Sequence, residues 1–323
     1  MAENLYRWNG DELVPVSAVN RMILGSSYWL PAADMKIGSY DIAGFGAIAA
    51  VYNGKIYTTN GQCYNNTGTK MKKYDPVNDV WEIVGDTGRN TYKAMGAVVN
   101  GKLYIIGGRY SLSGLTVDPS VYEYNLETGA CSFKTNMPTK LALGVAEAIN
   151  GKIYCIGGSN ESISISASVQ EYDPINNTWD TNKTAMPAAR NMASSAVCND
   201  KIYVFGGTNY LGQITDSVYR YDPLTDSWDI PTTMPYASSY LMSTVYGDDI
   251  YILGGTKLVS PGNELSHECY LYNSVNNTWR KLASTTHQRG GSGFVRLANK
   301  LYVFGGSDYN GKYIYSSMES LDI

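Results

Sequence analysis

Two arginines in equivalent positions are the first residues whose type and spacing could support chemistry. Arg190 stands 11 residues before Lys201, and Arg289 stands 11 residues before Lys300. A guanidinium group can hold a carboxylate through two parallel hydrogen bonds, so such a pair suits an acidic ligand. The sequence leaves open the alternative that both arginines are solvated charges at the rim of the molecule.

Two further charged residues interrupt short segments that are otherwise small and apolar. Arg296 stands where another copy of the same segment has Val197, and Glu147 stands where the others have Ala50, Ala97, Ala196, Thr244 and Val295. A charge at such a place must be paired or must face water. Glu147 could serve as a proton shuttle while Arg190 or Arg289 holds a carboxylate, which would suffice for general acid–base catalysis. A water-bound structural charge is the other interpretation.

Histidine and cysteine offer no signature of a metal site or a nucleophile. There are only two histidines, His267 and His287, and five cysteines without a Cys-x-x-Cys motif. Neither histidine has a partner at ligand spacing, and no Gly-x-Ser-x-Gly motif occurs. We therefore expect no metal and no cofactor, and an enzyme is the less favoured class. The cysteines read as reduced, small, buried residues.

The composition argues against charged macromolecular partners. The net charge is −4, only 17% of residues are charged, and no run of Lys and Arg occurs. Nucleic acid and anionic membranes are therefore poor candidates. Residues 1–10 contain no apolar signal core, and with reduced cysteines this suggests the cytoplasm or a virion, although the location itself stays open. Tyrosine is abundant, with 28 residues against 5 Phe, which suits recognition surfaces.

A Gly-Gly pair that follows a short apolar segment returns five times. Successive pairs lie 50, 49, 48 and 51 residues apart. A period of this length indicates a repeat architecture. The pairs are Gly107-Gly108, Gly157-Gly158, Gly206-Gly207, Gly254-Gly255 and Gly305-Gly306.

A Tyr that precedes a Trp by seven residues recurs in the same register. The pairs are Tyr74 with Trp81, Tyr172 with Trp179, Tyr221 with Trp228 and Tyr272 with Trp279. Two-residue hairpin turns recur as well, and six turns predict six units of four strands. The expected turns are Asn53-Gly54, Asn100-Gly101, Asn150-Gly151, Asn199-Asp200, Gly247-Asp248 and Asn299-Lys300.

These features resemble the kelch repeat, and the resemblance covers roughly residues 26–323. It is specific, because Gly-Gly, Tyr and Trp recur together in register. The first unit departs from it at Thr59-Asn60-Gly61, and the second has Cys131 in place of Trp. The resemblance implies an all-β, six-bladed β-propeller with four antiparallel strands in each blade.

The end of the sequence predicts how such a ring closes. Residues 317–323 align with the third strand of an earlier unit, residues 217–223, so the last blade lacks its fourth strand. Because an unpaired edge is a liability, we expect residues 26–32, with Trp29 in the Trp position, to complete the last blade. A competing hypothesis assigns this role to residues 13–16. We expect residues 1–20 to form a separate hairpin extension and residues 21–323 to form the propeller.

Candidate ligand-binding residues follow from the face on which propellers bind. In kelch proteins the loops after Gly-Gly and the loops between blades share a face at the mouth of the central channel, and arginines there often hold acidic groups. The resemblance therefore implies a protein or glycan ligand at this mouth. The candidates are Arg109, Tyr110, Arg190, Asn209, Tyr210, Tyr240, Arg289, Asp308 and Tyr309.

Two functions remain open from the sequence. The favoured one is a non-catalytic recognition module for a protein or a glycan. The alternative is a mutarotase for a sugar acid such as sialic acid, using Glu147 with Arg190 or Arg289, as six-bladed bacterial kelch enzymes suggest. The string at residues 6–16 also looks like short segments of phage tail and capsid-fibre proteins, which suggests part of a larger phage or bacterial surface assembly. The ligand, the host and the oligomeric state stay undetermined.

Overall fold

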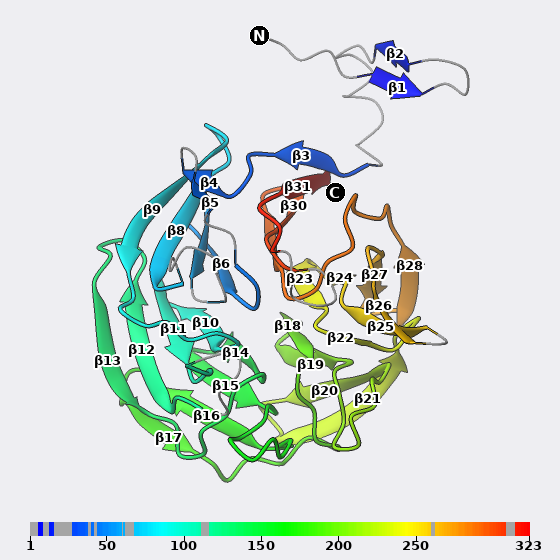
Figure 1. Ribbon diagram of the computed structural model, residues 1–323. Coiled ribbons are helices and arrows are strands. Elements are labelled where there is room, and N and C mark those ends of the chain that lie inside the picture. Colours follow the sequence, from blue (N-terminus) through cyan, green and yellow to red (C-terminus); the bar gives the residue numbers. More distant parts are fainter. Residues whose placement is uncertain are drawn as a thin grey trace.

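The computed structural model describes residues 6–8, 13–15, 28–37, 40–41, 44–59, 61, 68–110, 116–259, 262–307 and 314–323. These residues form a disc of six four-stranded antiparallel sheets around a central channel (Figure 1). The expected fold, an all-β, six-bladed β-propeller, is confirmed.

The strands of each blade run from the channel outward in the order of the chain, except in the last blade. Blade 1 contains β6 (Ile48–Tyr52), β7 (Lys55–Thr59), β8 (Lys70–Asp75) and β9 (Val80–Asp86). Blade 2 contains β10 (Met95–Val99), β11 (Lys102–Ile106), β12 (Ser120–Asn125) and β13 (Cys131–Asn136). Blade 3 contains β14 (Val145–Ile149), β15 (Lys152–Ile156), β16 (Val169–Asp173) and β17 (Thr178–Asp180).

The second half of the disc repeats this plan. Blade 4 contains β18 (Ser194–Cys198), β19 (Lys201–Phe205), β20 (Ser217–Asp222) and β21 (Ser227–Thr233). Blade 5 contains β23 (Met242–Tyr246), β24 (Asp249–Leu253), β27 (Cys269–Asn273) and β28 (Thr278–Lys281). Blade 6 contains β29 (Gly293–Leu297), β30 (Lys300–Phe304), β31 (Met318–Asp322) and β3 (Leu30–Ala32).

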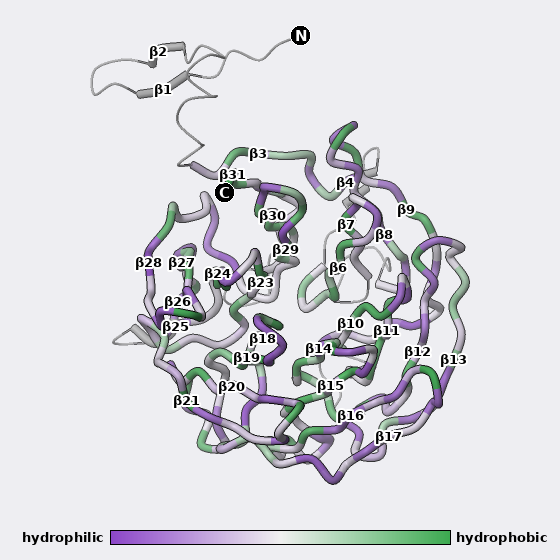
Figure 2. The backbone as a smooth tube through the Cα atoms, turned by 180° about the vertical axis from the view of Figure 1, so that it is seen from behind, coloured by the Kyte–Doolittle hydropathy of each residue, from purple (hydrophilic) through white to green (hydrophobic). Residues whose placement is uncertain are grey.

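Burial is greatest in the second strand of each blade and falls toward the rim of the disc. In the second strand of every blade, the last four residues are all buried, because neighbouring blades cover both faces of these β-branched and aromatic strands. Outer strands such as β9 and β21 are mostly exposed or half-buried. Figure 2 shows the same change, with hydrophobic colour on inner strands β6 and β10 and hydrophilic colour on outer strands β17 and β28.

The seven-residue spacing of Tyr and Trp produces direct cross-strand pairs between the third and fourth strands. Tyr172 lies opposite Trp179, with ring centroids 4.9 Å apart, and the other three pairs have the same register. The tyrosine hydroxyl donates a hydrogen bond to the residue five positions later, as from Tyr172 to Asn177 at 2.7 Å. The motif therefore fixes both the pairing and the turn.

The Gly-Gly pairs are required by a close approach of the backbone. The first glycine of each pair has a positive φ, and at Gly157 an added Cβ would lie 2.5 Å from the carbonyl oxygen of Arg190 in the loop to the next blade. The second glycine, Gly158, donates its N–H to this same oxygen at 2.8 Å. The pair thus lets the loop of the next blade sit directly on the strand end.

The ring is closed by the strand near the N-terminus, as expected. Strand β3 pairs antiparallel with β31, placing Leu30 opposite Ser320 (Figure 1). Trp29 is buried beside Phe294 and donates its indole N–H to the carbonyl of Ala283 in blade 5 at 2.9 Å. The competing hypothesis for residues 13–16 is wrong, because β2 (Leu13–Pro15) pairs with β1 (Tyr6–Trp8).

The hydrophobic core is divided into six clusters, one at each junction between neighbouring blades. An open arc of six blades would have only five such junctions. The sixth cluster, between blades 6 and 1, contains Met35, Phe304 and Met318 together with Tyr74 and Trp81. Packing at this junction therefore stabilises closure in addition to the pairing of β3.

The remaining elements lie outside the six blades, and one turn differs from expectation. Strands β4 (Lys36–Ile37) and β5 (Tyr40–Asp41) form a small hairpin, and β22 (Ser238–Ser239), β25 (Thr256–Val259) and β26 (Gly262–Leu265) form a three-stranded sheet. The last hairpin turn is Ala298-Asn299 rather than Asn299-Lys300, because Leu297 pairs with Lys300. Within the described ranges, no helix has the length and apolar character to cross a membrane.

Candidate functional site at the channel mouth

Six main-chain hydrogen bonds form a closed ring at the mouth of the channel. Each mouth residue donates its N–H to the carbonyl of the equivalent residue in the preceding blade, over 2.8 to 3.3 Å. We call these six residues the mouth ring. They are Gly46, Lys93, Leu143, Met192, Tyr240 and Gly291.

All six residues of the mouth ring have a positive φ, between 54° and 65°. Four of them carry side chains, although this backbone region is unfavourable for any residue other than glycine. The hydrogen bonds and the packed blades hold them there, so their side chains are presented at the mouth in fixed directions. Backbone strain that recurs at one place in four blades marks a candidate functional site.

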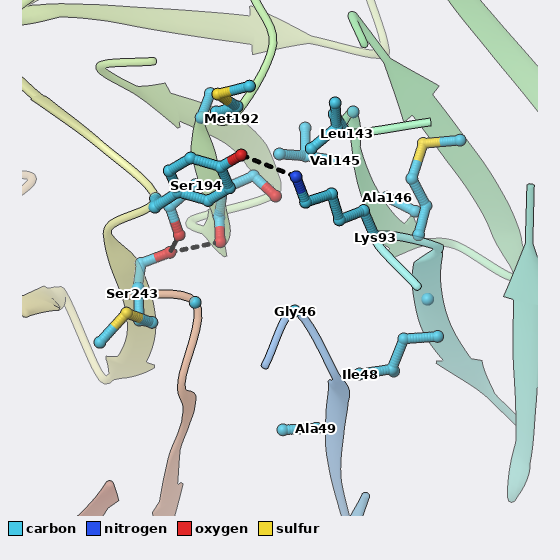
Figure 3. Close-up of a pocket in the computed structure, with 18 of the residues that line it drawn as sticks. Gly46, Ile48, Ala49, Lys93, Leu143, Val145, Ala146, Met192, Ser194 and Ser243 are labelled. Carbon is cyan, nitrogen blue, oxygen red and sulfur yellow. Dashed lines mark hydrogen bonds between the residues drawn. The ribbon is translucent and has the colours of Figure 1, made fainter. Parts of the chain in front are cut away.

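A cavity of about 280 Å³ is lined by the mouth ring and the first residues of the inner strands (Figure 3). The apolar part of its lining includes Ile48, Met95 and Phe294. Ser194, Ser195 and Ser243 also line it and carry hydroxyl groups. The volume is close to the lower limit of small-ligand pockets.

Lys93 and Tyr240 meet across this cavity. They are three positions apart in the ring of six, and Lys93 Nζ donates a hydrogen bond to the Tyr240 hydroxyl at 2.9 Å (Figure 3). Burial lowers the pKa of Lys93 to about 8, and the nearby charge of Arg109 lowers it further in the same direction. Burial also raises the pKa of Tyr240 to about 12. The phenol therefore keeps its proton, while part of the amine population loses its charge near neutral pH.

Glu147 lies deeper in the same cavity, on β14 of blade 3. It accepts a hydrogen bond from the Ser195 hydroxyl at 2.7 Å, and the Ser243 hydroxyl donates to the Ser195 carbonyl at 2.6 Å. The carboxyl touches the cavity, but the dense wall around it removes bulk water. This desolvation raises its pKa to about 7, against the opposing effect of the Ser195 hydrogen bond. Glu147 can therefore hold or release a proton near neutral pH.

The loops after Gly-Gly lie on the face of the mouth, as expected from the sequence. Arg109 forms a backbone bridge with Tyr92, which directly precedes Lys93, and Thr208 forms the equivalent bridge with Asn191. The buried Arg109 side chain donates to the Ser159 hydroxyl of the next blade at 3.2 Å. Tyr110, the following residue, is 54% exposed.

Asn209 and Tyr210 have different roles within one such loop. The side-chain oxygen of Asn209 accepts hydrogen bonds from the N–H groups of Leu211 and Gln213, at 2.9 and 3.0 Å, so Asn209 shapes the loop. Tyr210 at 75% and Leu211 at 62% are exposed at its tip. The loop therefore offers an apolar and aromatic tip on a fixed base.

Arg190 and Arg289 are buried between strands and do not line the cavity. Arg190 lies over the Tyr219 ring and donates to its hydroxyl at 3.0 Å, and Arg289 donates to Glu319 at 2.7 Å. The structure thus does not bring either arginine together with Glu147. Asp308 and Tyr309 lie outside the described residues.

Lys93 was missed by sequence reasoning, although a signal for it exists. Each described mouth residue from Lys93 to Gly291 stands 14 residues before the first glycine of its Gly-Gly pair. The constant offset marks a position, but the residues at it are Lys, Leu, Met, Tyr and Gly, so pattern matching gives no reason to select it. In the part of the chain that is described, no cluster of His, Cys, Asp or Glu could hold a metal ion.

The six-bladed disc and its mouth ring define the class of the protein. It is a six-bladed propeller with a candidate ligand site at one end of the channel. A family model described as the KLHDC2/KLHL20/DRC7 Kelch-repeats domain matches residues 143–323, and a Kelch motif model matches residues 96–138. The chain belongs to the kelch-repeat family, whose repeats generally mediate protein interactions.

Curated relatives match parts of the chain. Kelch-like protein 15 of Danio rerio is 30% identical over 195 residues, which cover 53% of this chain and 31% of that protein. Kelch repeat protein C2 of Vaccinia virus (strain Western Reserve) is 40% identical over 100 residues, covering 31% of this chain and 18% of that protein. The chain thus spans a third or less of the length of these two proteins.

A solved structure described as the structure of YjhT has the same fold. It aligns with a TM-score of 0.75 and 20% identity, covering 85% of this chain and 94% of that one. At this level of identity the likeness concerns the fold alone.

Proposed function

We propose that the chain is a non-catalytic recognition module that binds a protein through the mouth face of the propeller. The observation that carries the proposal is the exposure of Tyr110, Tyr210 and Leu211 on loops whose bases are bridged to residues that directly precede the mouth ring. Aromatic side chains on a rigid frame bury much area at a low entropic cost, and they are typical interface anchors.

The test compares two opposite faces of the same disc. A peptide selected from a displayed library against the full chain should bind at least about tenfold more weakly when Tyr110 and Tyr210 are replaced by Ala, since each aromatic anchor contributes more than 1 kcal/mol. The control is Ile175→Ala, which removes an 82% exposed aliphatic side chain from a turn between the third and fourth strands. An equal loss of peptide affinity in the tyrosine variant and in Ile175→Ala, or the failure to select any binding peptide, would contradict the proposal.

Two finer alternatives belong to the same proposal and have their own tests. A glycan ligand is supported by the same tyrosines, and a glycan array reports it directly. Membership in a larger phage or bacterial surface assembly rests only on the string at residues 6–16, and genes for tail or surface proteins beside the coding gene would support it.

The second candidate function is a sugar-acid mutarotase. It is favoured by one observation, namely that Glu147 lines the cavity with a pKa raised to about 7. Ring opening and closing needs a group that exchanges protons near neutral pH. Arg190 and Arg289 are held by Tyr219 and Glu319, so the cation available in the cavity is Lys93. Mutarotation of sialic acid that is lost in Glu147→Gln would favour this function over recognition.

A further inference from the structure

Lys93 differs from the other lysines in its partner. Most lysines in the described ranges pair with carboxylates, for example Lys152 with Asp173 and Lys201 with Asp222. For Lys93 the partner is the phenol of Tyr240, and the described part of the chain holds no carboxylate within ion-pair distance of it. Within the described ranges, the amine is therefore not committed to a salt bridge.

Aromatic rings enclose this amine on several sides. Lys93 Nζ lies 5.2 Å from the centroid of the Tyr240 ring, 5.5 Å from that of Tyr92 and 5.9 Å from that of Phe45. Phe45 and Tyr240 also contact each other, with centroids 5.7 Å apart. Such rings attract an ammonium group. Among the described residues the Tyr240 hydroxyl accepts a hydrogen bond from the amine, and one hydrogen bond replaces only part of the lost water. The surroundings consequently tolerate both the charged and the neutral amine.

Glycines in the mouth ring make room for this arrangement. A Cβ at Gly291 would lie 2.5 Å from the Phe45 ring, and one at Gly46 would lie 3.3 Å from the Lys93 side chain. Lys93 and Tyr240 are both only partly buried, so a small molecule can reach the amine from the mouth. The cavity of about 280 Å³ beside them limits such a molecule to a small one.

We propose that Lys93 is a carbonyl-reactive amine that binds a small aldehyde or α-keto compound as an imine, with the Tyr240 hydroxyl hydrogen-bonded to the reacting oxygen. This site adds a covalent capture of small molecules to the recognition of a macromolecule proposed above. Its support is the placement of an amine that has no salt bridge among the described residues, beside a phenol, in a cavity that opens at the mouth.

The chemistry balances without an oxidant or a reductant. The neutral Nζ adds its electron pair to the carbonyl carbon, a C–N bond forms, and the carbonyl oxygen takes up a proton from Tyr240. The nitrogen returns a proton to the phenolate, which gives a hemiaminal. The C–O bond then breaks, the oxygen leaves as water with a second proton from nitrogen, and the imine remains. Addition of water reverses every step.

The groups around Lys93 decide the pH at which this occurs. Burial and the charge of Arg109 lower the amine pKa to about 8, whereas the phenols of Tyr92 and Tyr240 have raised pKa values and stay neutral. Glu147 lines the same cavity with a pKa of about 7. At pH 7.5 the neutral fraction of such an amine exceeds that of an ordinary lysine by on the order of a hundredfold.

The experiment traps the imine by reduction. The full chain is incubated with glyoxylate and cyanoborohydride, and in parallel with propionaldehyde and cyanoborohydride, and the modified lysines are located by peptide mapping. We expect Lys93 to be modified at least about tenfold faster than Lys152 and Lys201, with a rate that rises around pH 8. The propionaldehyde arm separates imine formation from attraction of the glyoxylate carboxylate.

Two variants test the assignment. Lys93→Arg keeps the cation and should abolish the fast modification, while Tyr240→Phe keeps the ring and should slow it several-fold. The wild-type map decides the proposal even if a variant fails to fold. Modification of Lys93 no faster than of Lys152 with both carbonyl compounds would overturn it.

Discussion

Single glycines determine how closely neighbouring blades approach. Gly157 and Gly151 both have a positive φ, of 66° and 76°, but only Gly157 faces a backbone atom. At Gly157 an added Cβ would meet the Arg190 carbonyl oxygen at 2.5 Å, whereas nothing lies within 4 Å at Gly151. Comparing an Ala substitution at Gly157 with one at Gly151 therefore separates the cost of backbone strain from the cost of a steric clash.

We predict that Gly157→Ala destabilises the fold more than Gly151→Ala. An Ala at a positive φ costs about 1–2 kcal/mol, and both variants lose this amount. Gly157→Ala must in addition move the loop around Arg190, so its free energy of unfolding should fall by about 3 kcal/mol or more. Chemical denaturation of both variants measures the difference, and equal losses would contradict the steric argument.

Glu147 gives a pH dependence with a definite sign. Its pKa is about 7 in the folded chain and 4.5 as the ordinary value, so the folded state binds more protons between these values. Stability from this group is present below about pH 4.5 and is lost as the pH rises to about 7. We predict that Glu147→Gln removes this loss.

The measurement is the difference in the free energy of unfolding between wild type and Glu147→Gln across pH 4 to 8. The variant should gain on wild type with rising pH, by up to about 3 kcal/mol. Other titrating groups cancel in the difference. A difference that does not change with pH would show that Glu147 is solvated through the channel.

At the scale of elements, β3 completes the sheet of the last blade. Its pairing with β31 satisfies an edge that would otherwise be open, and Trp29 fills the core cluster between blades 5 and 6. We predict that a chain starting at residue 34 loses most of its stability, since burial of a Trp alone contributes about 3–5 kcal/mol. Thermal unfolding and size-exclusion chromatography should show a lower melting temperature and association through the open edge.

A chain starting at residue 21 is the matched control. We propose that residues 1–20 form an extension separate from the propeller of residues 21–323, so this chain should melt like the full one. A large loss in the control would instead show that the hairpin of β1 and β2 stabilises the ring.

The sequence predicted elements wherever one residue type is dictated by local geometry. Gly-Gly, the Tyr and Trp pair and the turn glycines each satisfy a specific backbone or packing need, so blade number, strand order and the closing strand were all predictable. The last turn was placed one residue late, because Ala298 adopts the positive φ that Asn or Gly usually takes. The mouth ring was not predicted, since its contacts are made by the main chain and leave no preferred side chain.

Some of the site residues were also predictable from the sequence, and others were not. Exposed loop residues such as Tyr110 and Tyr210 were predictable, because loops after Gly-Gly must lie on the mouth face. The burial of Arg190 and Arg289 was not, because it depends on Tyr219 and Glu319 in neighbouring strands. A sequence pattern predicts the backbone position of a residue. It does not predict which partner binds the end of a long side chain.

At the scale of the whole molecule, the ring is one continuous chain held shut by non-covalent contacts. Leu30 and Ser320 are direct partners across the closing pair of strands, which places their Cα atoms within the range that a disulfide accepts. We predict that Leu30→Cys with Ser320→Cys forms a disulfide that stabilises the ring. The chain-entropy model gives about 6 kcal/mol as an upper value for so long a loop.

Denaturation with and without a reducing agent measures this gain within a single preparation. The gain should vanish on reduction, and Leu30→Cys alone should show no dependence on the reducing agent. An oxidised double variant no more stable than its reduced form would contradict the prediction and would indicate that strain at the new disulfide cancels the entropic gain.

The mouth ring has a consequence for how such a protein can change its specificity. Its hydrogen bonds join N–H and C=O groups alone, so the frame of the mouth is independent of the side chains that it carries. Met192, which is half-buried, could therefore be exchanged for a polar or aromatic residue, at a cost set mainly by the backbone conformation that it already adopts. New ligand preferences can arise in this fold by single substitutions at mouth positions that already carry a side chain, without rebuilding any blade.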